Sequence, residues 1–181
     1  MATAITHAIV AGALGTLAPG DLPRVRLGFV LAVLSTMPDL DVIGFHFGIA
    51  YGDALGHRGF THSILFAAIA ALITPAIAFR GTPAFSRAWW NLVCLAFIAT
   101  ASHGVLDSFT DAGLGIGFFI PFDDTRYFAP WRPLETSPLS ISAFLNGPAA
   151  TILANELKWI GIPFFVLLGI GHWIRALRKR R

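Results

Sequence analysis

A histidine and an aspartate four residues apart are the first chemically suggestive feature of this sequence. His103 and Asp107 stand in the string SHGVLDS, inside a long apolar stretch. Residues four apart on a helix share one face, so both side chains would reach a single ion. Histidine nitrogen and aspartate oxygen are typical ligands of zinc and similar divalent ions. A hydrogen-bonded structural pair is the simpler alternative.

Two aspartates follow a proline in the string MPDLD. Asp41 could bind a metal ion, and Asp39 could bind the ion, orient a neighbouring ligand or act as a general base. A turn is the alternative interpretation, because aspartate and proline are both common in turns.

The polar string HRGFTHS stands directly before an uncharged apolar run. His57 and His62 are five residues apart, which on an ideal helix would separate them by about 140°. Gly59 lets the chain bend, so that His57 can approach a common ion from a loop and His62 from the start of a helix. Thr61 is the expected N-cap of that helix.

The remaining histidines are weaker candidates. His7 lies in the first apolar segment and completes the candidate ligand set, although a packed histidine is the simpler interpretation. His46 and His172 lack carboxylate neighbours, and we expect His172 to lie near the opposite membrane face. Cys94 is the single cysteine, which excludes an intramolecular disulfide and a cysteine-rich zinc site.

Three arginines could bind an anionic substrate. Arg58 stands beside the histidines, and Arg126 and Arg132 lie in the long connection with the string PFDDTRYFAPWRPLETSPLS. The planar guanidinium pairs well with phosphate oxygens. The aromatic residues of this connection suit a membrane interface, so an amphipathic loop lying on the bilayer is the alternative.

The composition predicts an integral membrane protein. The 181 residues are 55% hydrophobic and 13% charged, about half the charged share of a soluble protein. We expect an all-α helical bundle that forms a single domain over residues 1–181, with a basic cytoplasmic tail at residues 175–181. A basic tail after an apolar segment is ordinary membrane topology, so we expect no nucleic-acid partner. The N-terminus lacks a signal-peptide pattern, and we expect it to be retained.

Five apolar segments are candidates for transmembrane or half-buried helices. A transmembrane helix needs about 20 apolar residues. The first segment is short and could instead be a half-buried helix packed on the others. The candidates are residues 4–19, 26–44, 62–79, 88–109 and 157–175, with a long outer loop between the fourth and the fifth.

The basic residues predict how these helices are oriented. If five helices alternate in direction, one side receives nine basic residues and the other receives four. Arginine and lysine are in excess on cytoplasmic sides, so the C-terminus should be cytoplasmic and the N-terminus periplasmic. The candidate ligands of the first four segments then all fall on the periplasmic face. Ionisable groups in a membrane are costly, so this convergence indicates a shared site.

The motifs THAIVAGAL, MPDLD, HRGFTHS, SHGVLDSFTDAGLGIGFFIPF and RYFAPWRP, in this order, resemble the bacterial YdjM-like family of inner-membrane, metal-dependent hydrolases. The resemblance covers residues 6 to about 138. The family is distantly similar to zinc-dependent phospholipase C and P1 nuclease, all-α phosphodiesterases with clustered zinc ions. By this resemblance the polar positions of the family are His7, Asp41, His57, His62, His103 and Asp107, with Asp39 alongside. Because the periplasmic face offers fewer histidines than those enzymes use, one or two ions are expected rather than three.

Together these features predict a bacterial inner-membrane, metal-dependent hydrolase with its site at the periplasmic face. The expected substrate is a phosphoester, for example a lipid head group of the surrounding bilayer. The expected cofactor is a divalent metal, with zinc as the first candidate, which would activate a water molecule and polarise a phosphoryl oxygen. The alternative is a non-enzymatic membrane scaffold or regulator with a structural metal and a cytoplasmic protein partner. Metal or proton transport is less favoured, because the third and fifth segments carry few polar groups.

Overall fold

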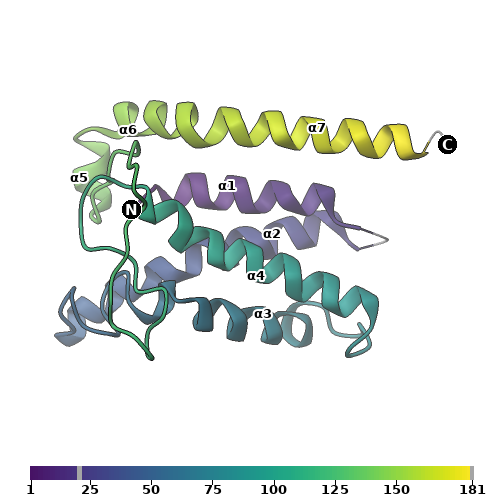
Figure 1. Cartoon of the computed structure of the whole chain (residues 1–181), viewed down its shortest axis with the longest axis horizontal. Coiled ribbons are helices and arrows are strands. Elements are labelled where there is room, and N and C mark those ends of the chain that lie inside the picture. Colours follow the sequence, from purple (N-terminus) through teal and green to yellow (C-terminus); the bar gives the residue numbers. More distant parts are fainter. Residues whose placement is uncertain (20–21, 180–181) are drawn as a thin grey trace.

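The computed structural model describes residues 1–19 and 22–179. The chain is all-helical, and its long helices lie side by side along one axis (Figure 1). Labels with α denote α-helices, and labels with η denote 3-10 or π segments. The elements are α1 (Ala4–Leu14), η1 (Gly15–Leu17), α2 (Arg24–Thr36), η2 (Met37–Phe47), η3 (Phe60–His62), α3 (Ile64–Ala78), α4 (Arg87–Ser108), α5 (Ile141–Leu145), α6 (Ala149–Glu156), η4 (Leu157–Gly161) and α7 (Ile162–Lys179).

Three helical stretches are long and apolar enough to cross a membrane. They are Arg24–Phe47, Arg87–Ser108 and Ala149–Leu177, with 24, 22 and 29 residues. Two shorter apolar helices, Ala4–Leu17 and Ile64–Ala78, complete the five segments expected from the sequence. The expected all-α helical bundle is therefore confirmed, including the short first segment.

The last helical stretch begins earlier than the sequence indicated. α6, η4 and α7 follow one another without interruption, so the helix starts at Ala149 and not near residue 157. Glu156 lies inside this stretch and is buried. A carboxylate is tolerated there because hydroxyl and backbone groups of Thr3 and Thr6 bind it. Arg180 and Arg181, at the end of the predicted basic tail, lie outside the described residues.

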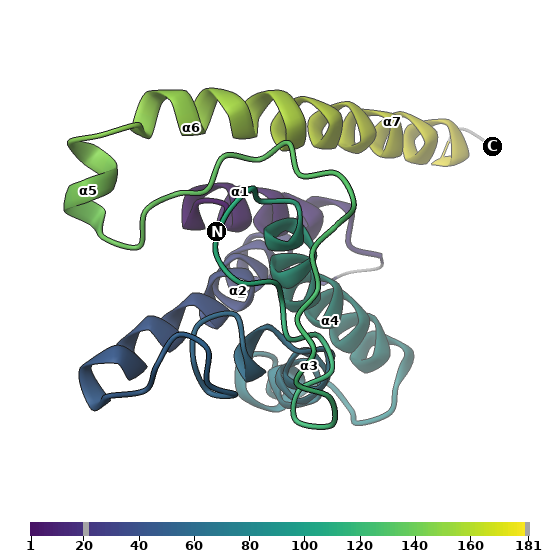
Figure 2. The same ribbon diagram turned by 60° about the vertical axis from the view of Figure 1, so that its left-hand side comes forward.

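The core of the bundle forms where α2 packs on α1 and α4, and α4 packs on α3. Leu31 of α2, Ala71 of α3 and Leu92 of α4 are buried in one apolar cluster. Glycines allow α1 and α2 to approach closely, since a Cβ atom on Gly15 would lie 2.7 Å from the Cα of Gly28. α7 lies on the α1 side of the bundle, as two views show (Figures 1 and 2).

Two local sequence signals mark where η2 and α3 begin. Pro38 lacks the N–H group that continues an α-helix, and α2 gives way there to the 3-10 segment η2. Ser63 caps α3, because its Oγ accepts a hydrogen bond from the backbone N–H of Phe66 at 3.0 Å. The expectation that Thr61 caps this helix is wrong: the Thr61 hydroxyl donates to Asp41 Oδ2 at 2.7 Å instead.

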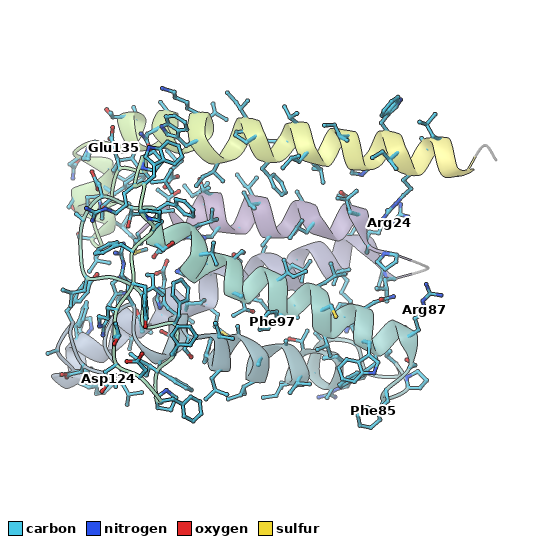
Figure 3. The ribbon with its side chains drawn as sticks, in the orientation of Figure 1. Arg24, Phe85, Arg87, Phe97, Asp124 and Glu135 are labelled. Carbon is cyan, nitrogen blue, oxygen red and sulfur yellow. The ribbon has the colours of Figure 1, made fainter. Side chains whose placement is uncertain are left out.

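The long outer loop folds back across one end of the bundle (Figures 1 and 2). It is fastened to that end by backbone hydrogen bonds, among them Gly117 N to Arg58 O at 2.9 Å and Ala129 N to Ser108 O at 2.9 Å. Arg24 and Arg87 lie at the opposite end (Figure 3). The loop therefore covers the end of the bundle that receives η2, η3 and the C-terminus of α4.

Candidate metal centre

All seven predicted metal ligands are buried at the loop-covered end of the bundle. They come from five separate segments, so the chain must fold completely before they can meet. The set comprises His7 from α1, Asp39 and Asp41 from η2, His57 from the following loop, His62 from η3, and His103 and Asp107 from α4. Figure 3 shows many of the polar side-chain atoms gathered at this end.

His103 presents a free nitrogen to the middle of this group. Its Nδ1 lies 2.6 Å from the backbone carbonyl oxygen of Ser35, so Nδ1 carries the proton and donates it. Nε2 is therefore left with a lone pair, 3.2 Å from Asp39 Oδ1. The carbonyl thus fixes both the tautomer and the orientation of the ring, as is usual for histidine ligands of metals.

His62 presents its own Nε2 to the same point. Its Nδ1 donates to the Thr61 hydroxyl at 3.1 Å, and that hydroxyl donates to Asp41. The Nε2 atoms of His62 and His103 are then 3.1 Å apart. Burial alone lowers the pKa of His62, but the carboxylates of Asp39 and Asp41 outweigh it and raise this pKa to about 9. Without a metal ion the His62 ring is therefore protonated, and its Nε2–H can donate to Nε2 of His103.

Asp39 and Asp107 complete a four-residue group with the two histidines. One ligand atom from each of these residues lies within 4.8 Å of the others. Asp39 Oδ2 and Asp107 Oδ2 are buried, and among the described residues neither has a hydrogen-bond partner. Buried carboxylate oxygens without partners are costly. Two nitrogens and two carboxylates around one point are a donor set that fits a divalent ion.

A second group shares His62 and adds Asp41 and His57. His57 Nδ1 donates to Asp41 Oδ1 at 2.7 Å, which leaves the Nε2 of His57 free. Both oxygens of Asp41 accept hydrogen bonds, since Oδ2 receives the Thr61 hydroxyl. Asp41 therefore orients two histidines in this structure, whereas the partnerless oxygens belong to the first group.

His7 packs against the first group from the side of α1. Its ring stacks on that of His103 with 3.9 Å between the ring centroids. Its Nε2 lies 3.4 Å from Asp107 Oδ1, which also accepts the backbone N–H of Ala2 at 2.7 Å. His7 thus holds Asp107 in place, and its buried Nδ1 has no partner in the described parts of the chain.

The three arginines occupy different positions. Arg58 is fully buried, and its guanidinium donates to the carbonyls of Ala112 and Leu114 and to the Thr110 hydroxyl. Its Nε lies 3.8 Å from Asp107 Oδ2, at the edge of the first group.

Arg126 and Arg132 belong to the outer loop. Arg126 donates to four backbone carbonyls, including that of His57 at 3.2 Å. Arg132 is exposed and stacks over the ring of Phe128, with its Cζ 4.6 Å from the ring centroid. Arg58 and Arg126 therefore fasten the rim of the site, while the guanidinium of Arg132 faces solvent.

With this geometry established, the comparison with known proteins decides the family. The YdjM inner membrane protein family matches residues 1–179. The chain belongs to the YdjM family. The Escherichia coli (strain K12) protein named Inner membrane protein YbcI is 37% identical over 176 residues, which cover 97% of this chain and 99% of that protein. No solved structure matches the chain.

Membership of the YdjM family makes this chain an inner membrane protein. The structure adds several candidate spans and a buried His/Asp group that could hold a metal ion. Its exposed apolar side chains, such as Phe29 and Leu167, suit a lipid environment. His46 and His172, the weaker candidates, are exposed and lie outside both groups.

Three of the contacts described above are not evident from the sequence. The contact of His103 with the Ser35 carbonyl cannot be predicted from residue types, because every residue has a backbone carbonyl. Thr61 was assigned to the helix cap and not to Asp41. Glu156 was overlooked because it precedes the expected fifth span, and its partners Thr3 and Thr6 are about 150 residues away. A lone acidic residue next to an apolar run was the available signal.

Proposed function

We propose that this YdjM-family protein is a membrane-bound, metal-dependent hydrolase that acts on phosphoesters, with lipid head groups as the substrate class. The observation that carries the proposal is the pair of Nε2 atoms 3.1 Å apart on His62 and His103. Each Nδ1 is held by a hydrogen bond, so both Nε2 atoms point at one place, next to two carboxylates. A divalent ion bound there would replace the proton that His62 otherwise shares with His103.

Asp39, His62, His103 and Asp107 would hold the ion, with zinc as the first candidate. Asp41, His57 and His62 would hold a second ion if two are bound. A bound divalent ion would supply a water of lowered pKa and a Lewis acid for a phosphoryl oxygen. Asp41 would hold the imidazole rings of His57 and His62 in their orientations, and the Ser35 carbonyl would orient the ring of His103.

Asp39 would be the residue nearest to an incoming substrate. Its side chain is 10% exposed, whereas the side chains of His62, His103 and Asp107 are fully buried. Water and substrate would therefore approach from the Asp39 side of the group. There Asp39 could bind the ion or accept a proton from the attacking water.

Arg132 would be the arginine that binds a substrate anion, because the donors of Arg58 and Arg126 already hold loop carbonyls. An arginine that stacks on an aromatic ring keeps its planar edge free for phosphate. Arg58 and Arg126 would act by holding the rim in shape.

The site would face the periplasm. Arg24 and Arg87 lie at the end of the bundle opposite to the loop-covered end (Figure 3). Basic residues favour the cytoplasmic side, so the loop-covered end would be periplasmic. A site at that depth would meet the head groups of the outer leaflet first.

A second candidate function rests on the burial of the group. A catalytic ion keeps an open position, whereas a structural ion is enclosed by protein ligands. Because three of the four side chains are fully buried, the ion could instead stabilise a non-enzymatic scaffold or regulator with a cytoplasmic partner.

Hydrolysis in lipid separates the two candidates. Zinc-loaded protein in vesicles, given a panel of phospholipids and soluble phosphodiesters, should release product in a metal-dependent way. His103→Ala should lose both metal and turnover. Arg132→Ala should keep the metal and lower turnover by roughly ten- to a hundredfold, the effect of one lost charge-assisted hydrogen bond.

Three results would contradict this proposal. Metal-loaded wild-type protein without activity on any substrate of the panel would favour the structural metal. Full activity of His103→Ala would remove the metal from the chemistry. Loss of metal in Arg132→Ala would make that residue a structural partner of the centre.

A further inference from the structure

An apolar groove runs along the bundle between α2 and α3. It has a volume of about 430 Å³. Its lining residues are Phe29, Val30, Val33 and Leu34 of α2, Met37 at the start of η2, and Phe66, Ile69, Ala70, Ile73, Thr74, Ile77 and Ala78 of α3. The lining residues recur every three or four positions, so each helix contributes one continuous face. In an inner membrane protein this groove opens to lipid.

The groove offers no polar group to an occupant. Thr74 carries the one hydroxyl among its lining side chains, and that hydroxyl donates to the carbonyl of Ala70 at 2.7 Å. An occupant must therefore be apolar over the whole length of the groove. Among the lining residues Ala70 and Ala78 are half-buried, whereas Phe29 and Ile77 are exposed.

The size of the groove favours a single hydrocarbon chain. Its α3 face extends from Phe66 to Ala78, which corresponds to about 18 Å at about 1.5 Å per residue. One leaflet contributes about half of a hydrocarbon core that is about 30 Å thick.

One end of the groove adjoins the metal centre. Met37 begins η2 and stands two residues before Asp39, and Phe66 lies one helical turn after His62. Leu34 precedes Ser35, whose carbonyl holds His103. A chain in the groove would therefore bring its polar end to the Asp39 side of the centre.

We infer that this groove binds one acyl chain of the phospholipid whose head group reaches the metal centre. The inference rests on the proposed function and deepens it, because it makes the substrate a membrane lipid and not a soluble phosphoester. The head group would be positioned by the chain, in the same way that remote binding positions any reacting group.

Photolabelling tests this inference directly. Full-length protein in nanodiscs of phosphatidylethanolamine and phosphatidylglycerol receives a trace of phosphatidylethanolamine with a diazirine in one acyl chain. After illumination, the labelled residues are mapped by mass spectrometry. Labels should concentrate on the residues that line the groove. Ile73→Trp, which fills the groove, should lower this labelling severalfold, and Ile69→Trp serves as a second variant should the first not fold.

Leu167→Trp is the matched control. Leu167 is an exposed aliphatic residue on α7, away from the groove, and its replacement should leave groove labelling unchanged. Labels spread over α2, α3 and α7 in proportion to exposure would overturn the inference, because the groove would then hold only bulk lipid. Crosslinks from groove residues to a second copy of the chain would overturn it as well.

The same experiment with His103→Ala separates this inference from the proposed function. Acyl-chain binding needs no metal, so groove labelling should persist in that variant. Persistent labelling together with inactive wild-type protein would refute the proposed hydrolase activity and support acyl-chain binding in the groove. Metal-dependent hydrolysis of phospholipid that Ile73→Trp leaves unchanged would refute the role of the groove and retain the hydrolase.

Discussion

At the scale of single residues, the centre depends on side chains that position other side chains. Asp41 accepts His57 Nδ1 at 2.7 Å and the Thr61 hydroxyl at 2.7 Å, and through these contacts it sets two imidazole rings. Asp41→Asn keeps the shape and removes the charge. We expect it to weaken metal binding roughly ten- to a hundredfold, the usual effect of losing such a partner. Chelator competition measures this, with exposed Asp124→Asn as the control; equal affinities in both variants would contradict it.

Arg58 makes a separate prediction about stability at the residue scale. Its guanidinium joins two carbonyls and one hydroxyl of the outer loop while fully buried. A lysine in its place has a single ammonium group and cannot reproduce this planar set of donors. Arg58→Lys should lower the free energy of unfolding by about 2 kcal/mol or more. Thermal unfolding in detergent measures this. Exposed Arg132→Lys should have little effect, and equal stability of the two variants would refute the assignment.

The candidate ligands could be predicted from residue types, whereas their mutual roles could not. Ionisable residues are rare in apolar segments, so His103, Asp107 and the MPDLD motif stand out in the sequence. Which aspartate would face an ion depends on the hydrogen bond that the Ser35 carbonyl accepts from His103 and on the one that the Thr61 hydroxyl donates to Asp41. Those contacts arise only when η2, η3 and α4 are packed together.

At the scale of elements, the contact between α1 and α2 depends on glycine. A Cβ atom on Gly15 would lie 2.7 Å from the backbone of Gly28, so one helix would have to shift. Gly15→Ala should therefore destabilise the protein by about 1–3 kcal/mol. Gly169→Ala on α7 is the control, because its Cβ would meet nothing within 4 Å, and alanine should stabilise that helix by up to about 1 kcal/mol. Thermal unfolding that shows equal shifts in both variants would contradict this packing.

The apolar pattern of the sequence predicts that a helix exists better than it predicts where the helix begins. All five apolar helices follow from predominantly apolar runs, as the span Arg87–Ser108 illustrates. The start of the last stretch at Ala149 does not, because Glu156 reads as polar until Thr3 and Thr6 are known to satisfy it. A carboxylate can lie inside an apolar helix when residues far away in the sequence bind it.

At the scale of the whole molecule, the distribution of charge predicts the topology. Nine of the basic residues fall on one side of the predicted bundle and four on the other. Reporter fusions after Gly81 and after Arg181 should therefore report the cytoplasm, and a fusion after Asp124 should report the periplasm. The opposite pattern would place the metal centre at the cytoplasmic face and remove the argument for head groups of the outer leaflet.

The central claim is that Asp39, His62, His103 and Asp107 hold a metal ion, and metal analysis of the purified, folded protein tests it most directly. Wild-type protein should carry at least one zinc or similar divalent ion per chain. His103→Ala and Asp107→Ala should each lose it, and His172→Ala, whose imidazole is exposed on α7, should keep it. Folded wild-type protein without bound metal, or unchanged metal content in both His103→Ala and Asp107→Ala, would contradict the account.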